Sequence, residues 1–419
     1  MARQKRATSN GAGGIRFWQK VLAALLVVGV VPIALVSFVS IQKTRTDLTD
    51  LGVTNIQQRS TSTGAALDAY LQNRLDDIVL VSRIPDVVRY ASSGDPALKD
   101  SATAAMKAAA ARSPEYESVA VVNAAGKIVA ASVATDEGTD VKFRQYVITP
   151  MTDGVPYISD PSYSVITNKP ALFFSAPVKD ASGKTIAVVR SRLNLTAIWG
   201  IVEADADSVG AGAHSFLLDD YGIRLAVSET KGNRDKAESL IYKPIAPIAP
   251  DVATKLVADK RFGTISSPDK LVVDALPTLK SALDPLKSGF TQFAYGAGSA
   301  EQRGVATRLT AKPWAYVLAV PLATYTKAAD DATYNAASVV GIGLILSLIV
   351  GVLLTRSLVK PLRQLVGVAT SVSTGDVDLR AAHFETRRGD DITREVASAF
   401  DRLLNALRFY AFADEAGEE

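Results

Sequence analysis

The chain has 419 residues, with 46 Lys and Arg against 43 Asp and Glu, two histidines and no cysteine. The lack of cysteine excludes a disulfide framework and thiolate metal sites, and His214 and His383 are too few for a multi-histidine metal site. A net charge of +3 spread over the whole chain does not form the basic face that nucleic-acid binding requires. The length predicts two to four domains.

A first apolar segment runs from Val21 to Ile41 without a charged residue, behind a basic N-terminus at 1–20. At about 1.5 Å per residue, a helix of this length crosses a hydrocarbon core of about 30 Å. A cleaved signal peptide is the alternative, but its apolar region is shorter and ends in a small-residue site, which this segment lacks. We therefore expect an uncleaved transmembrane helix at 21–41, with Pro32 tolerated inside it.

A second uncharged segment, 336–354, contains Gly341, Gly343 and Gly351, small residues that permit close helix approach. A buried core helix is the alternative, but so long an uncharged run is rare in a soluble core. Basic residues flank both spans on one side, before Val21 and after Leu354. The positive-inside rule then predicts cytoplasmic termini, an extracytoplasmic region at 42–335 and residence in the plasma (inner) membrane.

The extracytoplasmic region begins with a helical pattern over 42–90, which Gly52 and Gly64 weaken and Pro85 ends or breaks. A second helix is expected over 98–112. Strand-prone runs separated by glycine-containing turns then predict hairpins near 119–130, 177–189 and 216–227. Further strands are expected at 290–295, 304–309 and 314–320. The recurrence of the hairpin predicts an α+β fold with two lobes, about 90–205 and about 210–325, divided near 205–213.

Several segments resemble a double Cache (dCache) sensor domain: FRQY at 143–146, VPYISDP at 155–161, FFSAPVKDASGKTIAVV at 173–189 and WAYVLAVPL at 314–322. The resemblance implies a long N-terminal helix with two PAS-like antiparallel-sheet lobes, the distal one binding a small metabolite. Amino-acid-binding members carry an Arg, two aromatic residues shortly after it and an Asp on a later strand. Here Arg144 and Tyr146 match, while Val147 and Arg192 stand at the other two positions.

An Arg in place of the Asp would attract an anion and repel an α-ammonium group. Because strand residues alternate between faces, Arg190 and Arg192 lie on the same face. The sequence thus predicts a small organic anion, a carboxylate or dicarboxylate, as ligand. A solvent-exposed sheet face with salt bridges is the alternative. The candidate ligand-binding residues are Arg144, Tyr146, Tyr157, Asp160, Tyr163 and Arg192.

Residues 356–410 contain two heptad-like helical patterns around a connector, followed by an acidic tail at 411–419. The segment resembles a HAMP domain, with the marker positions Pro361, Gly375, Asp391 and Ile392. Thr393 replaces the usual Gly of the second marker, and an unrelated helical hairpin is the alternative. Two such helices bury too little alone, so a four-helix bundle from two chains predicts a homodimer.

The sequence shows no phosphate-binding glycine-rich run and no metal-ligand cluster, so we expect no catalysis and no cofactor. His214 and His383 are interpreted as structural. The prediction is a transmembrane sensor that relays ligand binding through HAMP to a separate cytoplasmic protein such as a kinase. The alternative is the truncated sensor half of a histidine kinase, cyclase or methyl-accepting chemotaxis protein; an adhesion or scaffold protein would leave the HAMP-like segment without a purpose.

Overall fold

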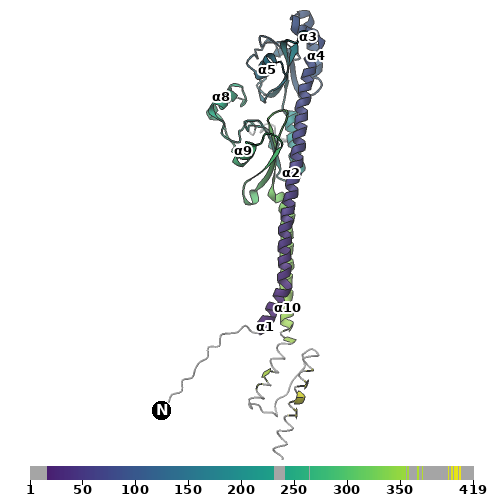
Figure 1. Cartoon of the computed structure of the whole chain (residues 1–419), viewed down its shortest axis with the longest axis vertical. Coiled ribbons are helices and arrows are strands. Elements are labelled where there is room, and N and C mark those ends of the chain that lie inside the picture. The colour runs from purple at the N-terminus through teal and green to yellow at the C-terminus, as the bar shows by residue number, and fades with distance from the viewer. Residues whose placement is uncertain are drawn as a thin grey trace, which may run out of the picture. The chain divides into compact units, whose positions relative to one another are not determined.

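The computed structural model (Figure 1) describes residues 17–230, 241–263 and 265–354, together with isolated residues between 356 and 406. The chain divides into two compact units. One comprises residues 1–46 and 328–419, and the other comprises residues 47–327. The HAMP marker positions Pro361, Gly375, Asp391 and Ile392, and also His383, lie outside the described residues.

Among the described residues, two helices are long and apolar enough to cross a membrane, one near the N-terminus and one ending at Leu354. The first apolar stretch comprises α1 (Phe17–Leu25), the π-helical η1 (Leu26–Val30) and the start of α2 (Val31–Val81). The π turn ends just before Val31, whose N–H bonds to the Leu26 carbonyl five residues earlier, and the next residue is Pro32, which has no N–H to donate.

The second apolar stretch belongs to α10 (Leu322–Leu354). Only 6% of the most apolar window of each helix is buried, which argues against the buried core helix considered as an alternative. Within this unit a Cβ at Gly351 would lie 2.8 Å from Leu22 Cδ1, so this glycine permits the close approach predicted for it.

Helix α2 is continuous past Gly52 and Gly64, where a weakened middle was predicted. These glycines make room for neighbours, because a Cβ at Gly52 would overlap the Tyr325 ring and one at Gly64 would lie 3.2 Å from Thr307 Cγ2. The helix ends at Val81, and α3 (Pro85–Ser93) begins with Pro85 in its first turn, as the sequence predicted. Helix α4 (Pro96–Ala110) follows.

The distal sheet has the strand order β2-β1-β6-β5-β3, with β4 paired to β5, and every pairing is antiparallel. Its strands are β1 (Tyr116–Asn123), β2 (Ile128–Ala131), β3 (Tyr157–Ile158), β4 (Ser162–Tyr163), β5 (Pro170–Lys179) and β6 (Thr185–Leu193). One face packs on α2, α3 and α4 through the core that includes Leu71 and Phe174. The other face carries η2 (Ala134–Asp136) and α5 (Gln145–Asp153).

The proximal sheet has the order β8-β7-β11-β10-β9 and is also antiparallel. Its strands are β7 (His214–Leu218), β8 (Arg224–Val227), β9 (Phe290–Tyr295), β10 (Gln302–Arg308) and β11 (Ala315–Pro321). Its helices are α6 (Thr196–Val209), η3 (Ser228–Thr230), α8 (Pro250–Ala258), η5 (Pro268–Lys270), α9 (Pro277–Leu283) and η6 (Gly298–Ala300).

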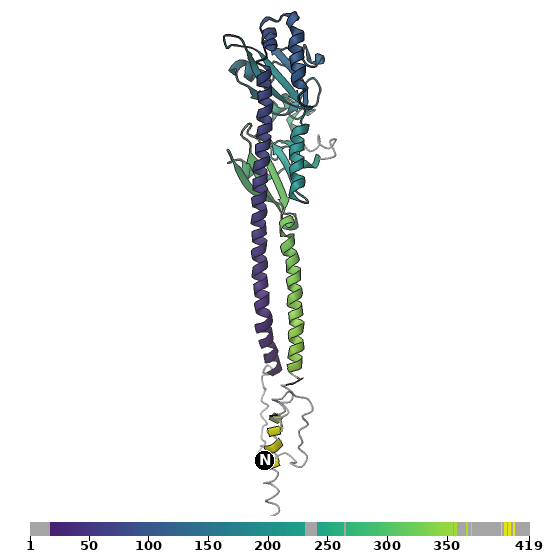
Figure 2. The ribbon, with the colours of Figure 1, turned by 90° about the vertical axis from the view of Figure 1, so that its right-hand side faces the viewer.

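The predicted α+β fold is confirmed, with its long first helix and two antiparallel sheets. In the unit 47–327, α2 passes beside both sheets (Figure 2), and residues of α2 contribute to the core of each. The chain moves from one sheet to the other through α6, so residues 205–209, where the lobe boundary was expected, form the end of a helix that packs on β7 and β8. The domain limits given above stay predictions.

Candidate functional site

The α5-facing side of the distal sheet holds a buried cluster of charges around Asp136. Asp136 Oδ2 lies 2.7 Å from Arg190 Nη2 and 3.0 Å from Arg192 Nη1. The two arginines share a face, as strand alternation predicted, but their side chains are 1% and 3% exposed. The alternative of a solvent-exposed face with salt bridges is therefore excluded.

Two further groups complete this cluster. Ser118 Oγ donates to Asp136 Oδ2 at 2.6 Å, and Arg192 Nε donates to Glu117 at 3.0 Å. Burial alone would raise the pKa of Asp136, but the Ser118 hydrogen bond and the charge of Arg190 hold it below its usual value. Asp136 Oδ1 and Arg190 Nε are buried without a hydrogen-bond partner within the structure as described, so one acceptor and one donor of this cluster remain unsatisfied.

Arg144 precedes α5 and is 5% exposed. Its guanidinium donates to two backbone carbonyls, those of Asp259 at 2.8 Å and Tyr163 at 2.9 Å. Burial lowers the pKa of Arg144. No carboxylate forms an ion pair with Arg144 in the part of the chain that the structure describes, and its Nε has no partner there either. A buried cation held by neutral carbonyls is a suitable anchor for an anion.

Tyr146 is a buried residue of α5, and the charges of Arg144 and of the cluster around Asp136 act on its phenol. Its ring stacks on Phe173 with centroids 4.3 Å apart. Burial raises the pKa of Tyr146, and the charges of Arg190, Arg144 and Arg192 act against that rise. All three guanidiniums therefore act on the same phenol, and the ligand-binding roles of Arg144, Tyr146 and Arg192 stay predictions.

The other three candidates lie where the two lobes meet. Asp160 pairs with Arg261 at 2.9 Å and Lys312 at 3.0 Å, and it accepts a hydrogen bond from Trp314 Nε1 at 2.9 Å. Lys312 Nζ also lies 5.6 Å from the centroid of the Tyr157 ring. These contacts join the loop after β3 to the loop before β11.

Tyr163 is also part of the contact between lobes. Its backbone N–H donates to the Lys260 carbonyl at 2.9 Å, and its ring packs on Tyr242 and on the backbone of Gly263. The ligand-binding roles of Tyr157, Asp160 and Tyr163 stay predictions, while their side chains make inter-lobe contacts.

Sequence reasoning missed Asp136 and Arg261. Asp136 is a single acid in a short 3-10 turn, and Arg261 directly follows α8. Neither position shows periodicity that would reveal its partners, which lie 54 and 101 residues away at Arg190 and Asp160. His214, interpreted as structural, begins β7, and its Nε2 pairs with the Tyr295 hydroxyl.

Comparisons with known proteins agree with this architecture. Residues 353–409 match the family model of the HAMP domain. The sensor domain of the V. cholerae histidine kinase DctB superposes with a TM-score of 0.50 at 12% sequence identity, over 64% of this chain and 96% of that one.

Two chemoreceptor ligand-binding domains are also similar to this chain. That of Campylobacter jejuni Tlp3 in complex with 4-methylisoleucine has a TM-score of 0.44 at 12% identity, covering 66% of this chain and 94% of that one. That of Pseudomonas fluorescens CtaA in complex with L-leucine has a TM-score of 0.43 at 16% identity, covering 67% and 97%. A search of curated protein sequences found no match.

A HAMP domain thus follows a helix that is apolar and long enough to span a membrane, and residues before that helix have the fold of the DctB sensor domain. The predicted HAMP domain is confirmed, and the predicted fold of two antiparallel-sheet lobes is shared with the DctB sensor domain.

Proposed function

We propose that this receptor binds a small organic anion, a carboxylate, at Arg144 of the distal lobe. The observation that carries the proposal is a buried guanidinium whose described partners are two neutral carbonyls. Arg192 does not act as a free cation, because Asp136 and Glu117 balance its charge. The anion argument therefore rests on Arg144, with Tyr146 beside it and Arg190 Nε as a further donor.

The same arginine links ligand binding to the rest of the sensor. One of its carbonyl partners, Asp259, follows α8 in the proximal lobe, so an anion on Arg144 would change the contact between lobes. A ligand shifts such an equilibrium by its different affinities for the two arrangements. We propose that the shift passes through the membrane helices of a homodimer to HAMP, and from there to a separate cytoplasmic protein such as a kinase.

Calorimetry of the full chain in lipid nanodiscs against a panel of small carboxylates tests the ligand site. Arg144→Gln should weaken binding of any carboxylate found by at least about tenfold, and Arg144→Lys should recover part of the loss, since an ammonium lacks the planar fork. Arg112→Gln, at a surface arginine paired with Asp77, is the matched control. Equal affinities in Arg144→Gln and Arg112→Gln would refute the site.

Both termini are proposed to be cytoplasmic and the sensor extracytoplasmic. A reporter fused after Glu419 and one inserted near Asp269 should then lie on opposite sides of the membrane. Reporters on the same side would contradict the two-span topology.

A further inference from the structure

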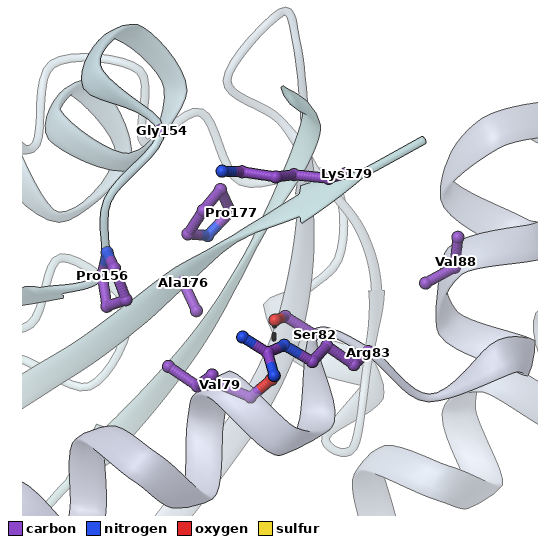
Figure 3. Close-up of a pocket in the computed structure, with 9 residues that line it drawn as sticks. All are labelled: Val79, Ser82, Arg83, Val88, Gly154, Pro156, Ala176, Pro177 and Lys179. Atoms are coloured by element: carbon purple, nitrogen blue, oxygen red, sulfur yellow. Dashed lines mark hydrogen bonds between the residues drawn. The ribbon is translucent and has the colours of Figure 1, made fainter. Parts of the chain in front are cut away.

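A cavity of about 330 Å³ lies where the end of α2 meets the edge of β5 (Figure 3). Its walls are largely apolar and include Val79 of α2, Val88 of α3 and Pro177 of β5. This volume is at the lower end of the range of about 300–1,000 Å³ found for small-molecule sites. The cavity shares no residue with the cluster around Arg144 and Asp136.

The cavity exists because the sheet stops short at this edge. Strand β3 pairs with β5 at Tyr157 and Ile158, and the next residue outward is Pro156, which has no N–H to donate. No strand covers the edge of β5 from Ala176 to Lys179 within the described structure. The missing pairing leaves space between β5, Pro156 and the last turn of α2.

Two cations line this space from opposite sides of β5. Arg83 belongs to the turn after α2, and Lys179 ends β5 beside Gly154 (Figure 3). A Cβ at Gly154 would lie 3.7 Å from Lys179 Nζ, an ordinary van der Waals distance, so the ammonium lies directly beside this glycine. Neither cation pairs with a carboxylate among residues 17–230, 241–263 and 265–354. Positive charge thus borders apolar walls with no internal counterion.

We propose that this cavity is a second ligand site, which takes a small organic anion with an apolar body. The anionic group would bind Arg83 and Lys179, and the apolar body would contact Val79, Val88 and the prolines. Such a ligand would hold the end of α2 to the edge of β5. Because α2 continues as one helix into the apolar segment, occupancy at this point would act directly on the helix that leads to the membrane.

Phenylacetate is a suitable probe, and phenylacetamide is its uncharged counterpart. Calorimetry of the full chain in nanodiscs should show phenylacetate binding, with phenylacetamide weaker by at least about fivefold. Arg83→Gln and Lys179→Gln should each weaken phenylacetate binding by at least about fivefold, and the double variant by more than about twentyfold. Arg89→Gln is the matched control, because Arg89 is exposed, pairs with Asp86 and does not line the cavity.

The proposal is overturned if phenylacetate does not bind, or if the double variant binds it as the unchanged chain does. Arg144→Gln separates the two sites. Loss of phenylacetate binding in Arg144→Gln, with Arg83→Gln and Lys179→Gln unaffected, would place the anion at Arg144 and reject this cavity. Phenylacetate binding that is retained in Arg144→Gln but lost in the double variant supports a ligand site in this cavity, independently of the result for the Arg144 site.

Discussion

Arg261 Nη1 lies 2.9 Å from Asp160 Oδ2, and this ion pair connects the two lobes of the sensor. Asp160 follows β3 of the distal sheet, whereas Arg261 follows α8 and also pairs through Nη2 with Asp219 at the end of β7. Asp219 Oδ1 accepts hydrogen bonds from the backbone of Tyr221 and Ile223, so the carboxylate is fixed in the turn before β8. One guanidinium therefore fixes two loops that belong to different sheets.

Removal of this guanidinium should destabilise the sensor strongly. Arg261→Met keeps apolar volume but takes the guanidinium away from Asp160, whose pKa is lowered and which is largely buried, so the free energy of unfolding should fall by about 3–5 kcal/mol. Lys280→Met, which breaks the exposed pair with Asp284, should cost no more than about 0.5 kcal/mol. Urea unfolding of the full chain, followed by tryptophan fluorescence, measures both. Equal losses would show that Arg261 is no more important than a surface charge.

Asp219 also predicts a dependence of stability on pH. Burial raises its pKa from 3.8 to about 7, against the opposing charge of Arg261. Between about pH 4 and pH 7 the unfolded chain has released this proton while the folded chain retains it. Protonated Asp219 therefore adds its largest contribution to the free energy of unfolding below about pH 4. That contribution decreases by at most about 1.4 kcal/mol per pH unit as the pH rises from about 4 to about 7.

Other groups near Asp219 titrate too, so the measurement is a difference between two proteins. Two neighbouring acids are present in both proteins. The charges of Arg261 and Lys312 lower the pKa of Asp160 despite its burial, whereas burial raises the pKa of Asp220. The stability of the unchanged chain minus that of Asp219→Asn should decrease between about pH 4 and pH 7. A constant difference over that interval would mean that Asp219 is ionised in the fold throughout.

Local features of this fold could be predicted from the sequence, and long-range partners could not. Pro85 in the first turn of α3 ends the preceding helix by its own chemistry, and the turn at Gly183 joins β5 to β6 through a residue with φ of +85°. Strand alternation likewise placed Arg190 and Arg192 on one face. Their burial depends on Asp136, which comes from another part of the chain, so no local pattern could distinguish a closed ion-pair cluster from an exposed face.

The ligand-site prediction illustrates the same limit. Tyr157, Asp160 and Tyr163 lie near Arg144 in the chain, and their grouping was reasonable on sequence distance. In the fold the side chains of Asp160 and Tyr157 contact Arg261 and Lys312, more than 80 residues away, and of these three residues only Tyr163 contacts Arg144, through its backbone carbonyl. A loop that contacts a second lobe has the same aromatic and acidic composition as a loop that contacts a ligand.

Asp136 should be the most important carboxylate of the distal lobe. Asp136→Asn removes the charge that both Arg190 and Arg192 contact, and the resulting buried cations should lower the free energy of unfolding by about 3–5 kcal/mol. Glu117→Gln is the matched control, because Glu117 also pairs with Arg192 but its side chain is 24% exposed. This variant should lower the free energy of unfolding by about 1 kcal/mol or less. Urea unfolding ranks the two variants. A smaller loss in Asp136→Asn than in Glu117→Gln would contradict the central position of Asp136.

The proposed homodimer predicts a specific pattern of crosslinks in the HAMP segment. Leu362 and Leu403 lie on the predicted heptad seams, and Leu403 is 56% exposed in the single chain, as expected of an apolar side chain whose partner is another copy. A parallel four-helix bundle brings equivalent seam residues together across the dimer axis. Because the chain has no cysteine, Leu362→Cys or Leu403→Cys creates a single thiol with no background.

Oxidation in native membranes should therefore give a disulfide-linked dimer in high yield at these two positions. Arg363→Cys and Arg402→Cys, one residue off the seams, should give much less, since in such a bundle their Cβ atoms would point away from the axis and a disulfide requires a Cβ separation of about 3.5–4.5 Å. Non-reducing electrophoresis compares the four yields. Equal yields at all four positions would indicate random collision in the membrane and would contradict the bundle.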